Sequence, residues 1–315
     1  MSEFFSNFST VFVQVLILFV LMGFGFIGNK TKLITEDGSR VMSDIVLYFV
    51  TPCLIINSFS SMKMDKEHLY GLIVCFVAFF VIMASTIVLV HLIFRGKNEQ
   101  KKRVLRFAVV FSNVGYMGIP LQEAVLGPEG VFYGSVCVGM FNIFVWTYGL
   151  VCSSGDFKNM SVKKVLFNPG IVAVTIGLII FLFSIPVKEY VPPVSQTLSL
   201  MAGLNTPVAM MVIGFNLANS NIWSSLKSVS TYVVAALRLV IIPLAALFVM
   251  LLFGIRGDIL VSLVIAASSP VAAVTTVFAI KYYNDINTSV NLVAFTTLLS
   301  IVTMPIIVAL AQIFE

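Results

Sequence analysis

The stretch Phe111-Ser112-Asn113-Val114-Gly115-Tyr116-Met117-Gly118-Ile119-Pro120 interrupts an apolar run that extends from Val104 to Glu123. Its two glycines weaken a helix, and its proline removes a backbone hydrogen-bond donor. A second run, from Asp258 to Lys281, is interrupted in the same way by Ser268-Ser269-Pro270 and the small and hydroxyl residues that follow. Both runs therefore predict helices that break part-way along their length.

The composition places these broken helices in a membrane. Hydrophobic residues make up 59% of the 315-residue chain and charged residues only 10%, whereas soluble domains carry about 25% charged residues. A chain of this length has room for about ten membrane helices of roughly 20 residues with short loops. The four cysteines and two histidines are scattered along the chain, so neither a disulfide framework nor a metal enzyme is expected.

Continuous apolar runs predict helices, because backbone groups in hydrocarbon must be hydrogen-bonded within their own segment. The runs do not alternate between apolar and polar residues, which argues against a β-barrel. The first run is expected to be a permanent helix, because residues 1–10 hold no basic residue that would mark a signal peptide. The sequence thus predicts an all-α polytopic membrane protein with ten transmembrane helices, at Phe8–Gly28, Val41–Ser60, Leu69–Phe94, Val104–Glu123, Val131–Ser153, Asn168–Ile185, Ser195–Ala218, Val229–Phe253, Asp258–Lys281 and Val290–Phe314.

The basic residues predict the orientation of the chain. The loops after the odd-numbered helices hold 14 of the 19 lysines and arginines, most densely between Arg95 and Arg106. By the positive-inside rule these loops are cytoplasmic, so both termini are expected outside the cell membrane. This distribution accounts for the net charge of +5 without a nucleic-acid surface, for which no basic and aromatic strip is visible.

Two halves of the sequence resemble each other. Thr51-Pro52 and Thr206-Pro207 are 155 positions apart, and the same offset relates Asn113 to Ser268 and Asn142 to Thr297. Each half holds five helices, and two odd-numbered halves in series must lie in opposite orientations, which is the inverted repeat of many secondary transporters. The predicted division is a first repeat at residues 1–153, a short cytoplasmic linker at 154–167 and a second repeat at 168–315.

The stretch from Asn113 to Leu121 resembles the Asn-x-x-x-Met-Gly-Ile-Pro-Leu signature of the auxin efflux carrier family, which includes plant PIN-type carriers and bacterial permeases. Weaker matches cover most of the rest of the chain, at Asn168-Pro169, at Thr206-Pro207 with Ile213–Ala218, and at Arg238 with Pro243. The long cytoplasmic loop of many plant members is missing. The chain thus looks like the compact bacterial branch, whose members are often named auxin, malate or malonate permeases.

The resemblance implies a fold of the bile-acid-symporter or NhaA type. In that fold the helices within residues 8–60 and 168–218 would form a scaffold. Those within 69–153 and 229–314 would form a moving transport domain, in which the broken fourth and ninth helices cross. The resemblance also maps Asn113, Pro120 and Pro270 to the crossing, and Asn142 to a position where the family often has an amide.

The physical chemistry of the breaks favours an anion as ligand. Half-helices present N-termini with partial positive charge and free N–H groups. The alternative is that the glycines and prolines provide only kinks and close packing. The predicted substrate-binding residues are Asn113, Gly115, Tyr116, Pro120, Asn142, Thr51, Thr206, Ser268, Ser269, Pro270 and Arg238.

Two charged residues at membrane depth are open to interpretation. An unpaired charge at the depth of Arg238 costs at least a few kcal/mol, so it must face protein or water. It either balances the C-termini of half-helices or attracts the anion. Glu123 ends its helix on the outer side and is expected to be solvated.

The predicted function is secondary transport of a small organic anion by alternating access. An anion channel and a ligand-sensing membrane protein are the alternatives, while an enzyme would need clustered His, Asp or Cys residues that are not visible. No cofactor is expected, and coupling to H⁺ or Na⁺ is left open. The expected partners are the anion and membrane lipid, with a homodimer as a further alternative.

Overall fold

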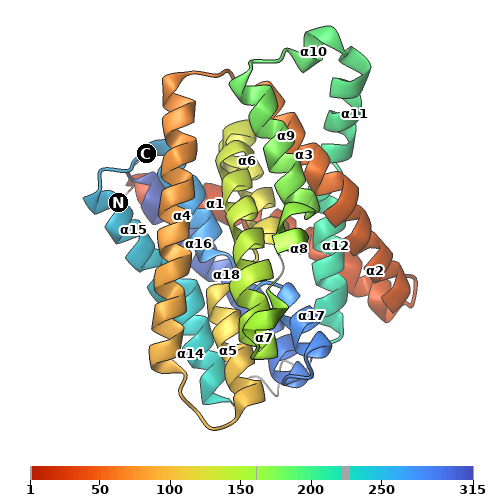
Figure 1. Cartoon of the computed structure of the whole chain (residues 1–315), viewed down its shortest axis with the longest axis vertical. Coiled ribbons are helices and arrows are strands. Elements are labelled where there is room, and N and C mark those ends of the chain that lie inside the picture. Colours follow the sequence, from red (N-terminus) through yellow and green to blue (C-terminus); the bar gives the residue numbers. More distant parts are fainter. Residues whose placement is uncertain (1, 161, 221–227, 315) are drawn as a thin grey trace.

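The computed structural model describes residues 2–160, 162–220 and 228–314. Within these residues all regular secondary structure is helical, apart from one isolated antiparallel bridge between Ser112 and Val271 (Figure 1). In the described part seven helical segments are long and apolar enough to cross a membrane, which confirms the prediction of an all-α polytopic membrane protein. The predicted count of ten helices stays a prediction. The seven segments are Phe4–Lys30, Glu36–Ser61, Lys66–Ile93, Val114–Ser154, Pro192–Ala218, Val229–Leu252 and Ile286–Gln312.

Several of these segments consist of more than one element. In chain order the α-helices are α1 (Ser2–Lys30), α2 (Glu36–Ile45), α3 (Thr51–Ser61), α4 (Lys66–Ile93), α5 (Glu99–Val110), α6 (Ile119–Phe144), α7 (Leu150–Ser154), α8 (Val162–Leu166), α9 (Pro169–Leu182), α10 (Val187–Tyr190), α11 (Pro192–Ala202), α12 (Asn205–Ala218), α14 (Val229–Ala236), α15 (Ile242–Leu252), α16 (Gly257–Ser268), α17 (Val274–Lys281) and α18 (Ile286–Gln312). The connecting π-helical turns are η1 (Val46–Val50), η2 (Val114–Gly118), η3 (Val145–Gly149) and η5 (Leu237–Ile241), and η4 (Phe157–Asn159) is a 3-10 turn.

Three of the π-helical turns come just before a proline. The backbone N–H groups of Thr51, Ile119 and Ile242 each donate to the carbonyl five residues earlier. The next residue in each case is Pro52, Pro120 or Pro243, which has no N–H to donate. The wider turn lets the helix continue past the missing donor. These prolines therefore lie within long helical segments instead of ending them.

Helices α1 and α12 approach so closely that their backbones touch. A Cβ atom added to Gly25 would lie 1.9 Å from the carbonyl oxygen of Met211, and one added to Gly214 would lie 1.8 Å from that of Met22. Small residues allow such close packing of membrane helices. The contact ties the first helix of the chain to α12, which carries Thr206.

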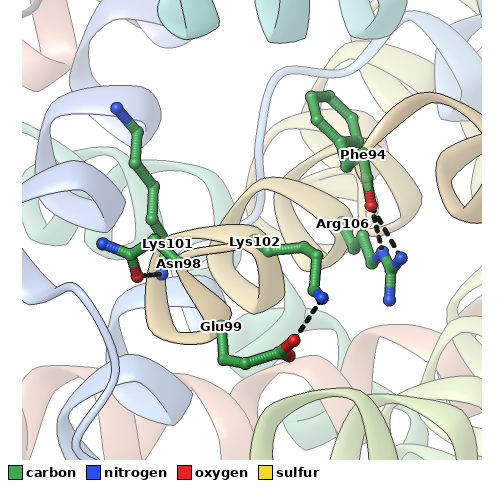
Figure 2. Close-up of polar contacts among 6 residues, drawn as sticks. All are labelled: Phe94, Asn98, Glu99, Lys101, Lys102 and Arg106. Carbon is green, nitrogen blue, oxygen red and sulfur yellow. Dashed lines mark hydrogen bonds and ion pairs between the residues drawn. The ribbon is translucent and has the colours of Figure 1, made fainter. Parts of the chain in front are cut away.

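The boundaries of the broken helix differ from the prediction. Its first part, α5, begins at Glu99 and not at Val104, because the Asn98 side chain accepts a hydrogen bond from the N–H of Lys101 at 3.0 Å and so caps the helix (Figure 2). The predicted helices Val104–Glu123 and Val131–Ser153 leave residues 124–130 as a loop, which is longer than the connection in the structure. It is reduced to a tight turn at Gly127, whose φ of 63° favours glycine. The linker at 154–167 contains η4 and α8 instead of only loop.

Candidate functional site

The two broken stretches lie directly against each other. Helix α5 ends at Val110 and α16 ends at Ser268, and the chain after each is extended. The N–H of Asn113 donates to the Pro270 carbonyl at 2.7 Å, and the N–H of Ala272 donates to the Phe111 carbonyl at 2.9 Å. The breaks thus satisfy part of each other's backbone, which accounts for the short antiparallel bridge at this depth. We call this region the crossover.

One further backbone donor of the crossover is satisfied from α18. The N–H of Val271 donates to the Thr296 hydroxyl at 3.1 Å, and this hydroxyl donates to the Leu292 carbonyl at 2.8 Å. Thr296 is fully buried. Thr296 is not among the predicted site residues, although the pair Thr296-Thr297 in an apolar run is a sequence signal for it.

Arg238 lies at the C-terminal ends of both half-helices. It comes from η5 and is 2% exposed. Its Nη1 donates to the Val109 carbonyl in α5 at 3.0 Å, and its Nη2 donates to the Ala267 carbonyl in α16. Helix C-termini carry partial negative charge and unpaired carbonyls, and one guanidinium serves both. This geometry favours the structural role of Arg238 over direct contact with a substrate.

Asn113 lies at the opposite, N-terminal side of the break. Its carbonyl accepts from the N–H groups of Met117 and Gly118 at 3.0 and 3.1 Å and so starts η2. Its side chain is 4% exposed, and Nδ2 has no hydrogen-bond partner among the described residues. A buried amide donor without a partner is uncommon. Asn113 therefore offers an unused donor beside the free N–H groups of a helix start.

The serines of the second break lie beside the same turn. A Cβ atom at Gly118 would lie 3.2 Å from the Ser269 Oγ, so η2 and the second break are in close contact. The hydroxyls of Ser268 and Ser269 both donate to the Ile265 carbonyl, at 3.3 and 2.9 Å. A hydroxyl hydrogen rotates about its C–O bond, so either serine can donate to a ligand in place of Ile265. The structure thus brings together four of the predicted site residues, namely Asn113, Ser268, Ser269 and Pro270. Pro120 follows η2 in the first turn of α6.

Two other predicted residues, Tyr116 and Asn142, point towards α2 and α9 respectively, and Gly115 lies beside open space. The Tyr116 hydroxyl donates to the Ser43 carbonyl in α2 at 3.4 Å, and a Cβ atom at Gly115 would meet open space. The Asn142 amide donates to the Val138 carbonyl at 2.9 Å within its own helix, and its Nδ2 lies 3.0 Å from where a Cβ atom at Gly170 would be. Asn142 therefore lies near the start of α9, and Gly115 lies on the open side of the break.

Thr51 and Thr206 lie between helices. The Thr51 hydroxyl donates to Asn205 Oδ1 at 3.0 Å and so joins α3 to α12. The Thr206 hydroxyl donates to Glu123 Oε2 at 3.3 Å and joins α12 to α6. The prediction of a solvated Glu123 is wrong, because the side chain is half-buried between these helices. This contact was not visible from the sequence, since the two residues are 83 positions apart.

Gln122 holds the two halves of the crossover together and was also missed. Its Nε2 donates to the carbonyl and the hydroxyl of Ser262 in α16, at 2.8 and 3.0 Å, and both residues are fully buried. Buried amides of this kind join membrane helices. As for metals, the described residues include no group of three or more His, Cys, Asp or Glu side chains that could hold an ion.

Comparison with known proteins identifies a family and relatives of this chain. A family model described as a membrane transport protein matches residues 10–158 and 156–308. An uncharacterized transporter from Methanothermobacter thermautotrophicus is 26% identical over 300 residues, which cover 93% of this chain and 95% of that protein. An uncharacterized transporter from Methanocaldococcus jannaschii is 23% identical over 304 residues, 92% of this chain and 95% of that protein.

These matches extend over nearly the whole chain and include both breaks of the crossover. They confirm the resemblance carried by the stretch from Asn113 to Leu121, and they indicate a transporter and not an enzyme. The chain is therefore a multi-pass membrane protein that belongs to the membrane transport protein family, also called the auxin efflux carrier family.

Proposed function

We propose that this transporter moves a small organic anion and binds it at the crossover, against Asn113, Ser268 and Ser269. The observation that carries the proposal is the uneven use of hydrogen-bonding groups there. The C-terminal ends of α5 and α16 are capped by Arg238, whereas the Asn113 amide on the N-terminal side is buried with an unused donor. Unused donors and partial positive charge on one side suit a carboxylate.

The charges around the crossover support an anion over a cation. The sequence holds no acidic residue between Glu99 and Glu123 or between Asp258 and Asp285. Neither broken stretch therefore supplies a carboxylate to a cationic amine. The Arg238 charge is engaged by two carbonyls but adds to the positive potential of the region.

We further propose that the chain has ten membrane helices in two inverted repeats that work by alternating access. The carbonyls that Arg238 binds, Val109 and Ala267, are 158 positions apart and end the two half-helices in the same way. We assign α1, α3, α9, α11 and α12 to the scaffold and α4, α6, α15, α16, α17 and α18 to the transport domain. The packing of α1 on α12 and of α3 on α9 supports the first group, and that of α16 on α6 and α18 supports the second, while α1 also packs on α18 across the two groups. Motion of the second group past the first would expose the crossover to each side in turn.

Uptake by purified protein in proteoliposomes tests the substrate and the mechanism. Saturable uptake of a radiolabelled mono- or dicarboxylate is expected, with accelerated exchange when the same anion is loaded inside. An anion channel would pass the anion without such counterflow, and a sensor would bind without flux. Uptake of primary amines with no response to any carboxylate would overturn the proposal.

The orientation proposed from the positive-inside rule has its own test. The basic connection between α4 and α5 lies at one end of the molecule and α10 at the other (Figure 1). The turn that follows α17 also contacts α7, because the Asn284 amide in this turn donates to the Ser153 carbonyl of α7 at 2.9 Å. With the native cysteines replaced by alanine, an impermeant thiol reagent on intact cells is expected to label Lys188→Cys but not Lys97→Cys. The reverse pattern would contradict the orientation.

A further inference from the structure

A cavity of about 560 Å³ lies at the basic end of the molecule, and none of its lining residues belongs to the two broken stretches of the crossover. It is formed by the end of α4, by α5, by η3 with α7, and by the turn that follows α7. The side chains that matter here are those of Arg103 and Arg106, which line it together with Glu99. Its volume lies within the range of about 300–1,000 Å³ that is typical of sites for small ligands.

Both arginines are held in place by backbone carbonyls. Arg106 donates to the Phe94 carbonyl from Nε at 3.1 Å and from Nη2 at 2.6 Å, as Figure 2 shows. Arg103 donates from Nη1 to the Ser154 carbonyl at 3.3 Å, and a Cβ atom at Gly155 would lie 2.2 Å from its Nη2. Both guanidiniums are half-buried. They are thus fixed before any ligand arrives, which reduces the entropy lost on binding.

The cavity has a net positive charge. Its acidic group, Glu99, forms an ion pair with Lys102, so its charge is already balanced (Figure 2). The hydrogen bond from Lys102 lowers the pKa of the Glu99 carboxyl, and the charges of Arg103 and Arg106 lower it further. Because Lys102 neutralises Glu99, the two arginines leave an excess of about two positive charges for an anion. Guanidinium groups pair with phosphate oxygens through two parallel hydrogen bonds.

The rim of the cavity carries apolar side chains, which favour the phosphate of a lipid over a soluble phosphate as the ligand. Phe157 is 78% exposed and Met160 is 47% exposed, and both line the cavity. Leu92 and Ile93, which follow the lining residue His91 at the end of the membrane helix α4, are also exposed. A phosphate bound to the arginines would therefore have apolar side chains next to it, where the acyl chains of a lipid could pack.

We propose that this cavity binds the phosphate headgroup of an anionic glycerophospholipid, with Arg103 and Arg106 as its ligands. The site is separate from the substrate site and does not depend on which anion is transported. Basic pockets at the ends of membrane helices suit such headgroups because positive charges near the surface attract anionic lipids.

Native mass spectrometry of the purified protein, titrated with phosphatidylglycerol, tests the proposal. One molecule is expected to bind in preference to phosphatidylcholine. Arg103→Gln and Arg106→Gln are each expected to weaken its binding about tenfold, the loss typical of one hydrogen bond to a charged group. Lys101→Gln is the matched control, since it removes the same charge from the same helix but its side chain points away from Glu99 and Arg106 (Figure 2). It should change the affinity less than twofold.

A variant that gains affinity keeps the test valid if an arginine variant folds poorly. Glu99→Gln removes the negative charge from the cavity and releases Lys102, so phosphatidylglycerol should bind several-fold more tightly. An equal loss in Lys101→Gln and Arg106→Gln would show only general attraction to a basic surface and would overturn the proposal. Displacement of the lipid by millimolar inorganic phosphate would identify a soluble phosphate site instead. Equal binding of phosphatidylcholine would also overturn it.

Discussion

Replacing Arg238 with leucine is expected to lower the free energy of unfolding by about 2–6 kcal/mol and to abolish transport. The change removes both hydrogen bonds and leaves the Val109 and Ala267 carbonyls buried without their partner. Each buried group that loses its partner costs about 1–3 kcal/mol. The two half-helix C-termini would also face each other without a cation between them. Unfolding in mixed detergent micelles measures the loss of stability, and proteoliposome uptake measures the loss of function.

Two further variants separate the structural role of Arg238 from contact with the substrate. Arg238→Lys keeps the charge but not the fork that reaches two carbonyls, so an intermediate loss of stability is expected. Arg256→Leu is the control, because Arg256 is exposed. Among the described residues it donates to the nearby Leu251 and Ile255 carbonyls and lies over the Phe314 ring, so its loss should cost no more than about 1 kcal/mol. If Arg238→Lys kept wild-type stability but lost anion affinity, Arg238 would belong to the substrate site.

The class of fold and the position of both breaks could be predicted from the sequence. Composition and the length of the apolar runs require membrane helices, and Gly115, Gly118, Pro120 and Pro270 mark where the backbone cannot stay regular. The helix boundaries were less predictable. They depend on local devices such as the Asn98 cap and the positive φ of Gly127, whose effects extend over only a few residues.

The partners of individual polar side chains could not be predicted, because they depend on contacts between distant parts of the chain. Arg238 bonds to residues 129 and 29 positions away, and Glu123 to one 83 positions away. The 155-residue offset matched Asn113 with Ser268, whereas the carbonyls bound by Arg238 are 158 positions apart. The sequence thus locates the two breaks, but it does not give the register between them.

Replacing Asn113 with alanine is expected to weaken anion binding about tenfold to a hundredfold with little change in stability. The loss of a hydrogen bond to a charged ligand costs about 1.5–3 kcal/mol, which corresponds to that range of affinity. Stability should hold because Nδ2 has no partner among the described residues and because the backbone bonds of Asn113 to Pro270, Met117 and Gly118 do not involve the side chain. Ligand-dependent thermal stabilisation of the purified variant measures the affinity.

Asn142→Ala is the matched control for this prediction, since it also truncates an amide in the same long helical segment. The Asn142 amide already donates to the Val138 carbonyl and lies near Gly170. Its loss should therefore reduce the affinity for the anion less than the loss of the Asn113 amide does. The reverse order would move the substrate towards the start of α9. A folded Asn113→Ala protein with unchanged affinity would remove Asn113 from the site. Unchanged affinity in Ser268→Ala as well would place the anion away from the crossover, since these two residues represent its two breaks.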